Sequence, residues 1–104
     1  MVGNSIYVKQ GDILNLDGNI KNALVVSKNI FNLEGRAIVC PIVNVASKSP
    51  LHLPLSQGNT KGYILCEQLK YINLNSRNFI ISDSVSIDDI VEISNRIESI
   101  FDYY

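Results

Sequence analysis

Apolar residues follow two different periods along this 104-residue chain. Up to about residue 81 they form short alternating or clustered runs between turn-forming residues, which is typical of β-strands. Beyond Ser86 they recur every three or four positions, which indicates one amphipathic helix. That stripe consists of Ile87, Ile90, Val91, Ile97, Ile100, Phe101 and Tyr104. We therefore expect a mainly β fold, a small, strongly bent sheet or barrel with a C-terminal amphipathic helix closing one side.

The individual runs predict where the elements lie. We expect a strand over residues 6–16 that bends at Gly11, and further strands over residues 23–27, 36–43, 51–55, 63–69 and 79–81. The third of these is rich in β-branched residues and should be buried on both faces, whereas Pro54 favours an edge position for the fourth. Single helical turns are expected within residues 29–35 and 74–77, a turn at 17–19, and loops at 45–50 and 56–62.

Composition bounds the class of protein. The length suits one domain over residues 1–104, and 46% hydrophobic with 18% charged residues is typical of a globular chain. The longest apolar runs, such as residues 37–43, are far shorter than the roughly 18 residues that a membrane-spanning helix needs. The first residues show no basic segment followed by an apolar stretch, so no signal peptide is expected and the predicted location is the cytoplasm.

The two cysteines, Cys40 and Cys66, lie in apolar, β-branched runs and are expected to be free, buried thiols. The chain has one histidine, His52, so these three side chains cannot supply the four ligands of a structural zinc site. No ligand spacing adds carboxylates to them. We therefore expect no metal and no other cofactor.

Charge is distributed unevenly. Residues 1–78 carry a net charge of +4, and residues 79–104 carry −5, so the chain totals −1. A basic body next to an acidic helix is compatible with a face that binds a polyanion. An ordinary solvated surface explains the same distribution, and charge alone does not separate the two.

Six segments of the chain resemble the PemK/MazF toxins. They are residues 8–13 (VKQGDI), 23–32, 37–42, 50–55 (PLHLPL), 60–70 (TKGYILCEQLK) and 73–77, and they keep the order and spacing of that family from about residue 6 to residue 101. The resemblance implies an SH3-like barrel that forms a homodimer. It also implies a toxin of a type II toxin–antitoxin system, an endoribonuclease (mRNA interferase) that cleaves single-stranded RNA without a metal. A cognate antitoxin would inhibit it by laying a disordered tail across the RNA groove.

The chain departs from the family pattern at two places. The segment between the first two strands is about ten residues shorter than is usual there, and Lys21-Asn22 stands where the family has Arg-Pro. Lysine keeps the positive charge but not the bidentate fork of a guanidinium. Val43 stands where the family has Thr or Ser, and it cannot form a hydrogen bond through its side chain.

The resemblance also suggests which residues carry the chemistry. Attack by the RNA 2′-hydroxyl needs a proton acceptor, a proton donor for the leaving oxygen and positive charge beside the phosphate. The candidate catalytic residues are Lys21 and Glu67. The candidate RNA-binding residues are Ser47, Lys48, Ser49, His52, Lys61, Gln68 and Arg77.

Each candidate also has a plain structural reading. Glu67 can be an ordinary carboxylate, His52 a histidine on a strand face, and Gln68 a turn residue. Tyr7, Tyr63 and Tyr71 could stack on bases, although half-buried strand tyrosines are commoner.

Two functions therefore remain open. One is an active endoribonuclease with weakened chemistry, and the other is a catalytically degenerate member that dimerises and binds RNA or an antitoxin without cleaving. A peptide-binding SH3-like adaptor is a weaker third, because the chain has no tryptophan and no signal of an aromatic-lined groove.

Overall fold

A computed structural model describes residues 7–18 and 21–101 of the chain. Strand β1 (Asp12–Leu16) and β2 (Asn22–Val25) form a hairpin, and the single turn α1 (Asn29–Asn32) leads into the long strand β3 (Arg36–Val43). A second hairpin follows, of β4 (His52–Gln57) and β5 (Thr60–Leu65). The remaining elements are β6 (Lys70–Asn73), η1 (Leu74–Ser76), β7 (Phe79–Ser84), α2 (Ile87–Glu98) and η2 (Ser99–Phe101).

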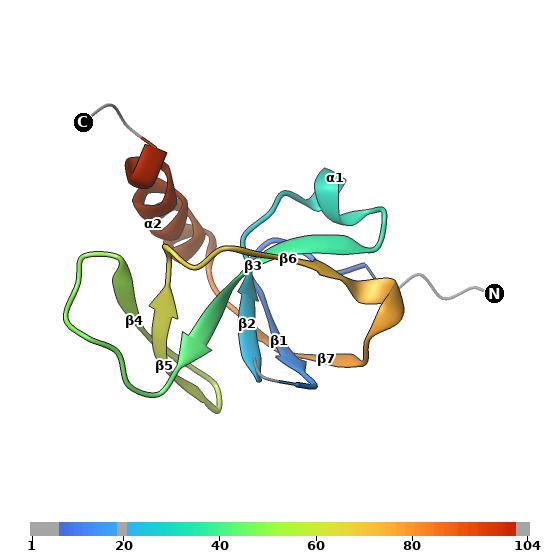
Figure 1. Cartoon of the computed structure of the whole chain (residues 1–104), viewed down its shortest axis with the longest axis horizontal. Coiled ribbons are helices and arrows are strands. Elements are labelled where there is room, and N and C mark those ends of the chain that lie inside the picture. Colours follow the sequence, from blue (N-terminus) through green and yellow to red (C-terminus); the bar gives the residue numbers. More distant parts are fainter. Residues whose placement is uncertain (1–6, 19–20, 102–104) are drawn as a thin grey trace.

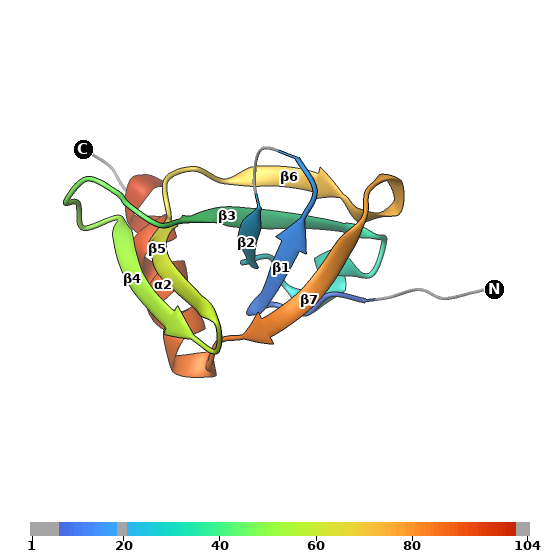
Figure 2. The same ribbon diagram turned by 90° about the horizontal axis from the view of Figure 1, so that it is seen from below.

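The described strands form one antiparallel sheet in the order β4-β5-β3-β2-β1-β7, with β6 also paired to β3. Strand β3 is long enough to pair with two strands along one edge. Its residues Arg36 to Val39 pair with β6, and its last two residues pair with β5. The sheet curls into a half-barrel whose two sides are the β4–β5 hairpin and the β1–β7 pair (Figures 1 and 2). Helix α2 lies behind the β4–β5 side in Figure 2. The mainly β fold class with one C-terminal helix is confirmed.

Apolar side chains fill two layers, one on each face of the central strands. One cluster joins β1, β2, β3 and β6 and includes Leu14, Val39 and Ile72. The other joins β2, β3 and β5 to α2, and Ile93 of the helix is buried in it. Because alternate residues of a strand point to opposite faces and both faces are covered, β1 to β3 are mostly apolar, and Asn15 is their one exposed residue. Burial of β3 on both faces and of both cysteines is as expected.

The helix begins where the sequence indicates. Ser86 is the N-cap, and its Oγ accepts a hydrogen bond of 3.2 Å from the backbone N–H of Asp89. Asp88 and Asp89 lie in the first turn, where the helix dipole favours negative charge. No helix in the described part of the chain is long and apolar enough to cross a membrane.

The expected helix stripe is partly wrong. Ile93, which the stripe omitted, is 2% exposed and is the centre of the buried face, with Ile97 packed beside it. Ile87 and Val91 are instead 79% and 54% exposed, and Phe101 is exposed as well. The helix carries more apolar surface than the sheet can cover, so periodicity alone could not distinguish the covered side. Tyr104 lies outside the described residues.

Three strand boundaries also differ from expectation. Residues 56–62 are not a loop, because β4 and β5 continue to a two-residue turn at Gly58 and Asn59, where Gly58 has a φ of +57°. The strand expected over residues 63–69 ends at Leu65, where a turn closed by the N–H of Gln68 on the carbonyl of Leu65 redirects the chain into β6. The first strand starts only at Asp12 because Gly11 breaks the extended conformation with a φ of +98°, and Ile6 lies outside the described residues. The edge position of β4 is confirmed.

Candidate nucleic-acid interface

A row of side chains crosses the ends of four strands on the solvent side of the sheet. Val43 is paired with Tyr63, and Tyr63 with Pro54. Asn22 is paired with Ile42, so the same register places Lys21, one residue earlier, level with Val43. Cross-strand partners point to the same face of an antiparallel sheet. The row therefore places Lys21 on one side of Val43 and Tyr63 on the other. Pro54 follows Tyr63, and all four side chains reach the surface.

The same face continues along the β4–β5 hairpin. His52 is paired with Leu65 and Ser56 with Lys61, so His52 and Lys61 point to the side of the hairpin that carries Tyr63. We call the surface formed by Lys21, Val43, His52, Lys61 and Tyr63 the outer face. Tyr63 is 37% exposed, which leaves its ring accessible. An accessible aromatic ring beside lysines is the combination with which proteins bind single-stranded nucleic acids.

His52 is held by two acceptors. Its Nδ1 lies 2.7 Å from the backbone carbonyl oxygen of Ser47, and its Nε2 lies 2.9 Å from Oε2 of Glu67. A carbonyl and an ionised carboxylate can only accept, so both ring nitrogens must carry a hydrogen for both bonds to form. The geometry therefore selects the imidazolium form of His52. Its side chain is 12% exposed and that of Glu67 is 32% exposed, so the pair is partly shielded from water.

The pKa values move in the directions that this ion pair requires. The hydrogen bond to Glu67 raises the pKa of His52 above its usual value, and the bond to the Ser47 carbonyl adds to that effect. The hydrogen bond from His52 lowers the pKa of the Glu67 carboxyl. A carboxylate with a lowered pKa is a weak base at neutral pH, because it holds a proton less readily. The ability of Glu67 to act as a base, which its predicted catalytic role requires, is therefore reduced by its hydrogen bond to His52.

Arg77 belongs to the same region, although it lies 60 residues from its partner in sequence. Its Nη2 donates a hydrogen bond of 2.9 Å to the carbonyl oxygen of Asp17, in the turn that joins β1 to β2. The guanidinium thus lies at the end of β1, where the N–H of Leu16 bonds to the Lys21 carbonyl. Arg77 and Lys21 therefore lie at the same end of the β1–β2 hairpin.

The other predicted RNA-binding residues lie in the segments around the Glu67–His52 pair. Ser47, Lys48 and Ser49 lie in the connection between β3 and β4, where the first two are exposed and Ser49 is half-buried. Oγ of Ser49 accepts a hydrogen bond from the backbone N–H of Leu51. Gln68 is exposed in the turn after β5, where its own N–H bonds to Leu65.

Lys21 and Glu67 are not in contact. No ion pair in the described part of the chain joins them, and the only partner of Glu67 in such a pair is His52. Lys21 is level with Val43, whereas Glu67 lies in the turn between Ile64, which is paired with Ile42, and Lys70, which is paired with Val39. A substrate group that meets both side chains would have to lie between them, over Val43 and Tyr63.

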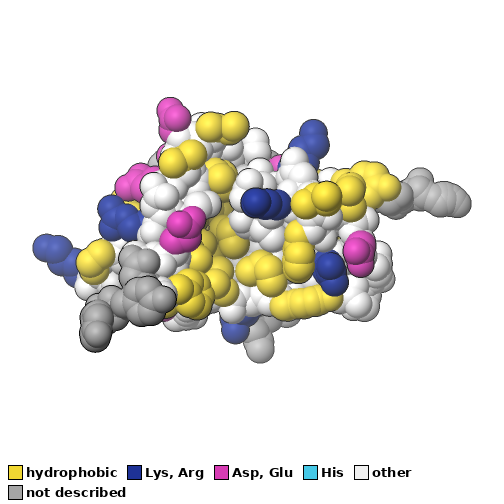
Figure 3. Space-filling view, turned by 90° about the horizontal axis from the view of Figure 1, so that it is seen from above, with side chains coloured by type: hydrophobic (Ala, Val, Ile, Leu, Met, Phe, Trp, Pro, Cys, Tyr) yellow, Lys and Arg dark blue, Asp and Glu magenta, His cyan; other side chains and the backbone are white. Residues whose placement is uncertain are grey.

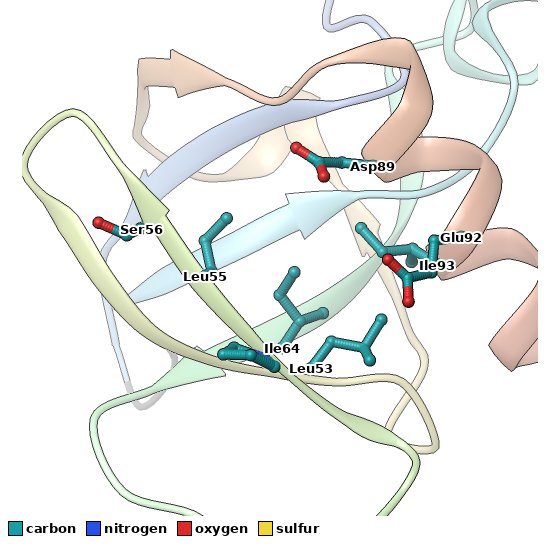
Figure 4. A pocket seen from close by; sticks show the side chains of 8 residues that line it. Leu53, Leu55, Ser56, Ile64, Asp89, Glu92 and Ile93 are labelled. Carbon is teal, nitrogen blue, oxygen red and sulfur yellow. The ribbon is translucent and has the colours of Figure 1, made fainter.

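The inner side of the same hairpin has a different character. A cleft of about 150 Å³ lies between the hairpin and α2, with Leu53, Leu55 and Ile64 on one side and Ile93 on the other (Figure 4). Asp89 and Glu92 of the helix also line it. Two carboxylates repel a phosphodiester, and the cleft is smaller than the pockets that bind nucleotide-sized ligands. RNA is thus expected on the outer face.

The two thiols are unsuited to chemistry. Burial raises the pKa of Cys40 to about 12 and that of Cys66 to about 11. Both therefore remain protonated at neutral pH and are poor nucleophiles. Among residues 7–18 and 21–101, no three His, Cys, Asp or Glu side chains are placed to share a metal ion.

One contact of this region has no signal in the sequence. Arg96 of α2 donates a hydrogen bond of 2.6 Å from Nη1 to the carbonyl oxygen of Pro50, 46 residues away. In the sequence it reads only as a basic residue near the end of an acidic helix. The contact arises because α2 packs beside the hairpin.

Comparison with known proteins decides the family. Residues 9–101 match the family model described as the PemK-like, MazF-like toxin of type II toxin–antitoxin systems. The chain belongs to the PemK/MazF toxin family. A search of curated proteins found no match.

Solved structures of MazF proteins share the fold of this PemK/MazF chain. A MazE–MazF complex from Deinococcus radiodurans is similar with a TM-score of 0.83 and 20% identity, over 93% of this chain and 98% of that one. A mycobacterial endoribonuclease in complex with its cognate antitoxin gives 0.75 and 13% identity, over 90% and 94%. The Mycobacterium tuberculosis toxin MazF-mt6 gives 0.67 and 14%, over 92% and 99%. The resemblance seen in the sequence is thereby confirmed.

Proposed function

We propose that this PemK/MazF chain is a cytoplasmic toxin that binds single-stranded RNA across its outer face and cleaves it without a metal. The observation that carries the proposal is the row in which Lys21 and Tyr63 flank Val43 next to the Glu67–His52 pair. Base stacking on Tyr63 and phosphate contacts to Lys21 and Lys61 suit a single strand. Arg77 adds charge at the end nearest Lys21, and Ser47, Lys48, Ser49 and Gln68 border the other end.

Lys21 and Glu67 would share the chemistry of strand cleavage. The 2′-hydroxyl attacks the adjacent phosphorus, its proton passes to a base, and the 5′-oxygen leaves with a proton, which yields a 2′,3′-cyclic phosphate. The Lys21 ammonium would offset the negative charge that develops on the phosphate, and we assign it as the proton donor to the leaving oxygen. We assign Glu67 as the acceptor of the 2′ proton, and its lowered pKa makes it a weak acceptor, so we expect slow cleavage.

A second candidate, RNA binding without cleavage, rests on two observations at the same place. Val43 provides no hydrogen bond at the centre of the row, and His52 already occupies Oε2 of Glu67. Such a protein would retain the RNA surface and the partner surfaces but lose turnover.

The deciding experiment incubates a long single-stranded RNA with the protein in EDTA. Cleavage by the wild type that is lost in Lys21→Ala, and retained in Lys9→Ala, supports a metal-independent ribonuclease that uses Lys21. Lys9 is a matched control because it is an exposed lysine outside the outer face. If the folded wild type binds the RNA without cleaving it, the second candidate holds, and cleavage gained by a Lys21→Arg, Val43→Thr double variant would assign the lost activity to these two positions. If the folded wild type neither cleaves nor binds RNA, both candidates fail.

A homodimer is part of the proposal, and the surface suggests where it forms. Two apolar hollows of about 300 and 330 Å³ lie along α2 and share Gln10, and Val26, Ile38, Ile90 and Ile97 are among their lining residues. Figure 3 shows hydrophobic side chains gathered on this side of the molecule. The exposed Ile87, Val91 and Phe101 lie on the same helix and its end. An apolar surface of this kind is typical of an interface.

Light scattering coupled to gel filtration tests the dimer. Val91→Glu should convert it to monomers, because a charge would be buried in the interface. Ile80→Glu is the matched control, since Ile80 is 69% exposed on β7, which is not part of this surface. Equal masses for both variants and the wild type would exclude this interface.

An antitoxin is the other proposed partner, because two of the similar structures are toxins in complex with MazE or a cognate antitoxin. Co-purification with the product of a neighbouring gene, and inhibition of RNA binding by that product, would test it.

A further inference from the structure

The connection between β3 and β4, residues 44–51, receives side-chain hydrogen bonds from two other elements. We call it the β3–β4 loop. His52 bonds to the Ser47 carbonyl near its middle, and Arg96 bonds to the Pro50 carbonyl near its end. Within the loop, the N–H of Leu51 bonds to Oγ of Ser49, and the N–H of His52 bonds to the Ser49 carbonyl. Two carbonyls of the loop thus depend on positively charged donors outside it.

The two donors differ in how they respond to pH. A guanidinium keeps its proton throughout the physiological range. An imidazole does not, and a neutral His52 can donate to only one of its two acceptors. Above the pKa of His52, either the Ser47 carbonyl or Glu67 loses its hydrogen bond. The bond from Arg96 to Pro50 is unaffected by that proton.

Arg96 is held in place from its own helix. Its Nη2 lies 3.4 Å from Oε2 of Glu92, one turn earlier, and its side chain is 37% exposed. The short bond of Nη1 to Pro50 therefore comes from a side chain that is oriented by a second contact. Leu51, the next residue of the loop, packs into the same apolar cluster as Ile93 and Ile97 of the helix. Loop and helix are joined by both packing and a charge-assisted hydrogen bond.

The charged groups near His52 are few. Glu67 faces it from the turn after β5, and Lys48 lies in the loop itself, next to Ser47. Arg96 and Glu92 of α2 act on the neighbouring Cys66, whose thiol remains neutral. His52 itself is an imidazole, whose ordinary pKa of about 6.5 lies closest to neutrality, and the bond to Glu67 raises it.

We propose that Arg96 is a positioning residue, which holds the β3–β4 loop through Pro50 so that the loop keeps its RNA-binding shape when His52 loses its proton. The part that concerns RNA rests on the proposed function, since Ser47, Lys48 and Ser49 are assigned to RNA only there. The part that concerns the loop rests on the contacts alone. The consequence is a loop whose shape depends less on pH while Arg96 is present than in its absence.

The test measures RNA affinity from pH 5.5 to 8.5 at constant ionic strength. The probe is a fluorescein-labelled 20-nucleotide single strand of 2′-O-methyl RNA of random sequence, which offers no 2′-hydroxyl for attack. Arg96→Ala should bind like the wild type at pH 5.5 and about tenfold more weakly at pH 8.5, since a hydrogen bond to a charged group contributes on the order of 1.5 kcal/mol. The wild type and the charge control Lys9→Ala should show parallel, shallower pH profiles. Arg96→Lys, which keeps one donor, should fall between them.

Amide chemical shifts of residues 45–49 and of Leu51 provide a second measurement that needs no RNA. In Arg96→Ala they should move as His52 titrates and stay close to wild-type values below its pKa. Parallel affinity profiles for Arg96→Ala and the wild type, together with unchanged loop shifts, would overturn the inference. An equal loss of affinity at all pH values would also overturn it, because it would indicate a direct phosphate contact. If the wild type binds no RNA, the proposed function fails, and the loop shifts alone decide the role of Arg96.

Discussion

Replacing Ile93 by alanine tests whether α2 is held to the sheet by the face that the structure shows. Ile93 is 2% exposed and packs in the cluster with Ile13, Leu24 and Ile64. The change deletes three carbon atoms, and their loss from a buried position costs about 2.4 kcal/mol at ~0.8 kcal/mol each. A closed cavity would add to this cost. Ile93 instead borders the cleft of Figure 4, so water and Leu53 can fill part of the space. We therefore expect a total of about 3 kcal/mol, in the lower half of the range for such changes.

Urea unfolding followed by circular dichroism measures this cost. With an m-value of about 1.5 kcal/mol/M, the midpoint should fall by about 2 M. Ile80→Ala is the matched control, because Ile80 is 69% exposed on β7, outside the proposed dimer surface, and it should change stability by less than about 0.5 kcal/mol. All proteins must be compared at one protomer concentration, since dimerisation would add to the apparent stability. A loss below about 1 kcal/mol for Ile93→Ala, or an equal loss for both variants, would refute the assignment of the buried face.

Three further outcomes are expected. The Glu67–His52 pair should contribute stability in full between about pH 4.5 and 6.5, and this contribution should fade as pH rises through the raised pKa of His52 or falls through the lowered pKa of Glu67. Glu67→Gln should therefore flatten the decline of thermal stability above pH 6.5. Cys40 and Cys66 should react with a thiol reagent only on unfolding, because their pKa values are about 12 and about 11 and both are buried. Lys21→Ala should reduce the slope of log affinity for single-stranded RNA against log salt by about 0.7, the share of one phosphate contact.

Each of these has a clear contrary result. A steeper loss of stability above pH 6.5 in Glu67→Gln than in the wild type would show that the carboxylate does not stabilise the imidazolium. Rapid thiol modification of the native protein would contradict the burial of the cysteines. If Lys21→Ala left the salt slope unchanged while Lys9→Ala reduced it by about 0.7, the RNA would lie away from the outer face.

Local pattern determined much of this protein. The strands over residues 36–43 and around Leu53, the N-cap at Ser86 and the terminal helix follow from periods, turn residues and caps that act over a few residues. The same is true of the buried cysteines. The family could be identified from the sequence because its segments keep a fixed order and spacing, even though the similar solved structures above share at most 20% identity with the chain.

Only the tertiary structure decided which surfaces meet. Strand β6 was not expected, because its four residues gain their place by pairing with the first half of β3, a partner that lies more than 30 residues earlier. The covered side of α2 depends on where the sheet curls, so Ile93 rather than Ile87 is buried. Lys21 came to share a row with Tyr63, with Val43 between them, through the register of three strands, and Arg96 met Pro50 through helix packing. Contacts of this kind depend on distances set by the whole fold, whereas the pattern of a sequence reports mainly on neighbours along the chain.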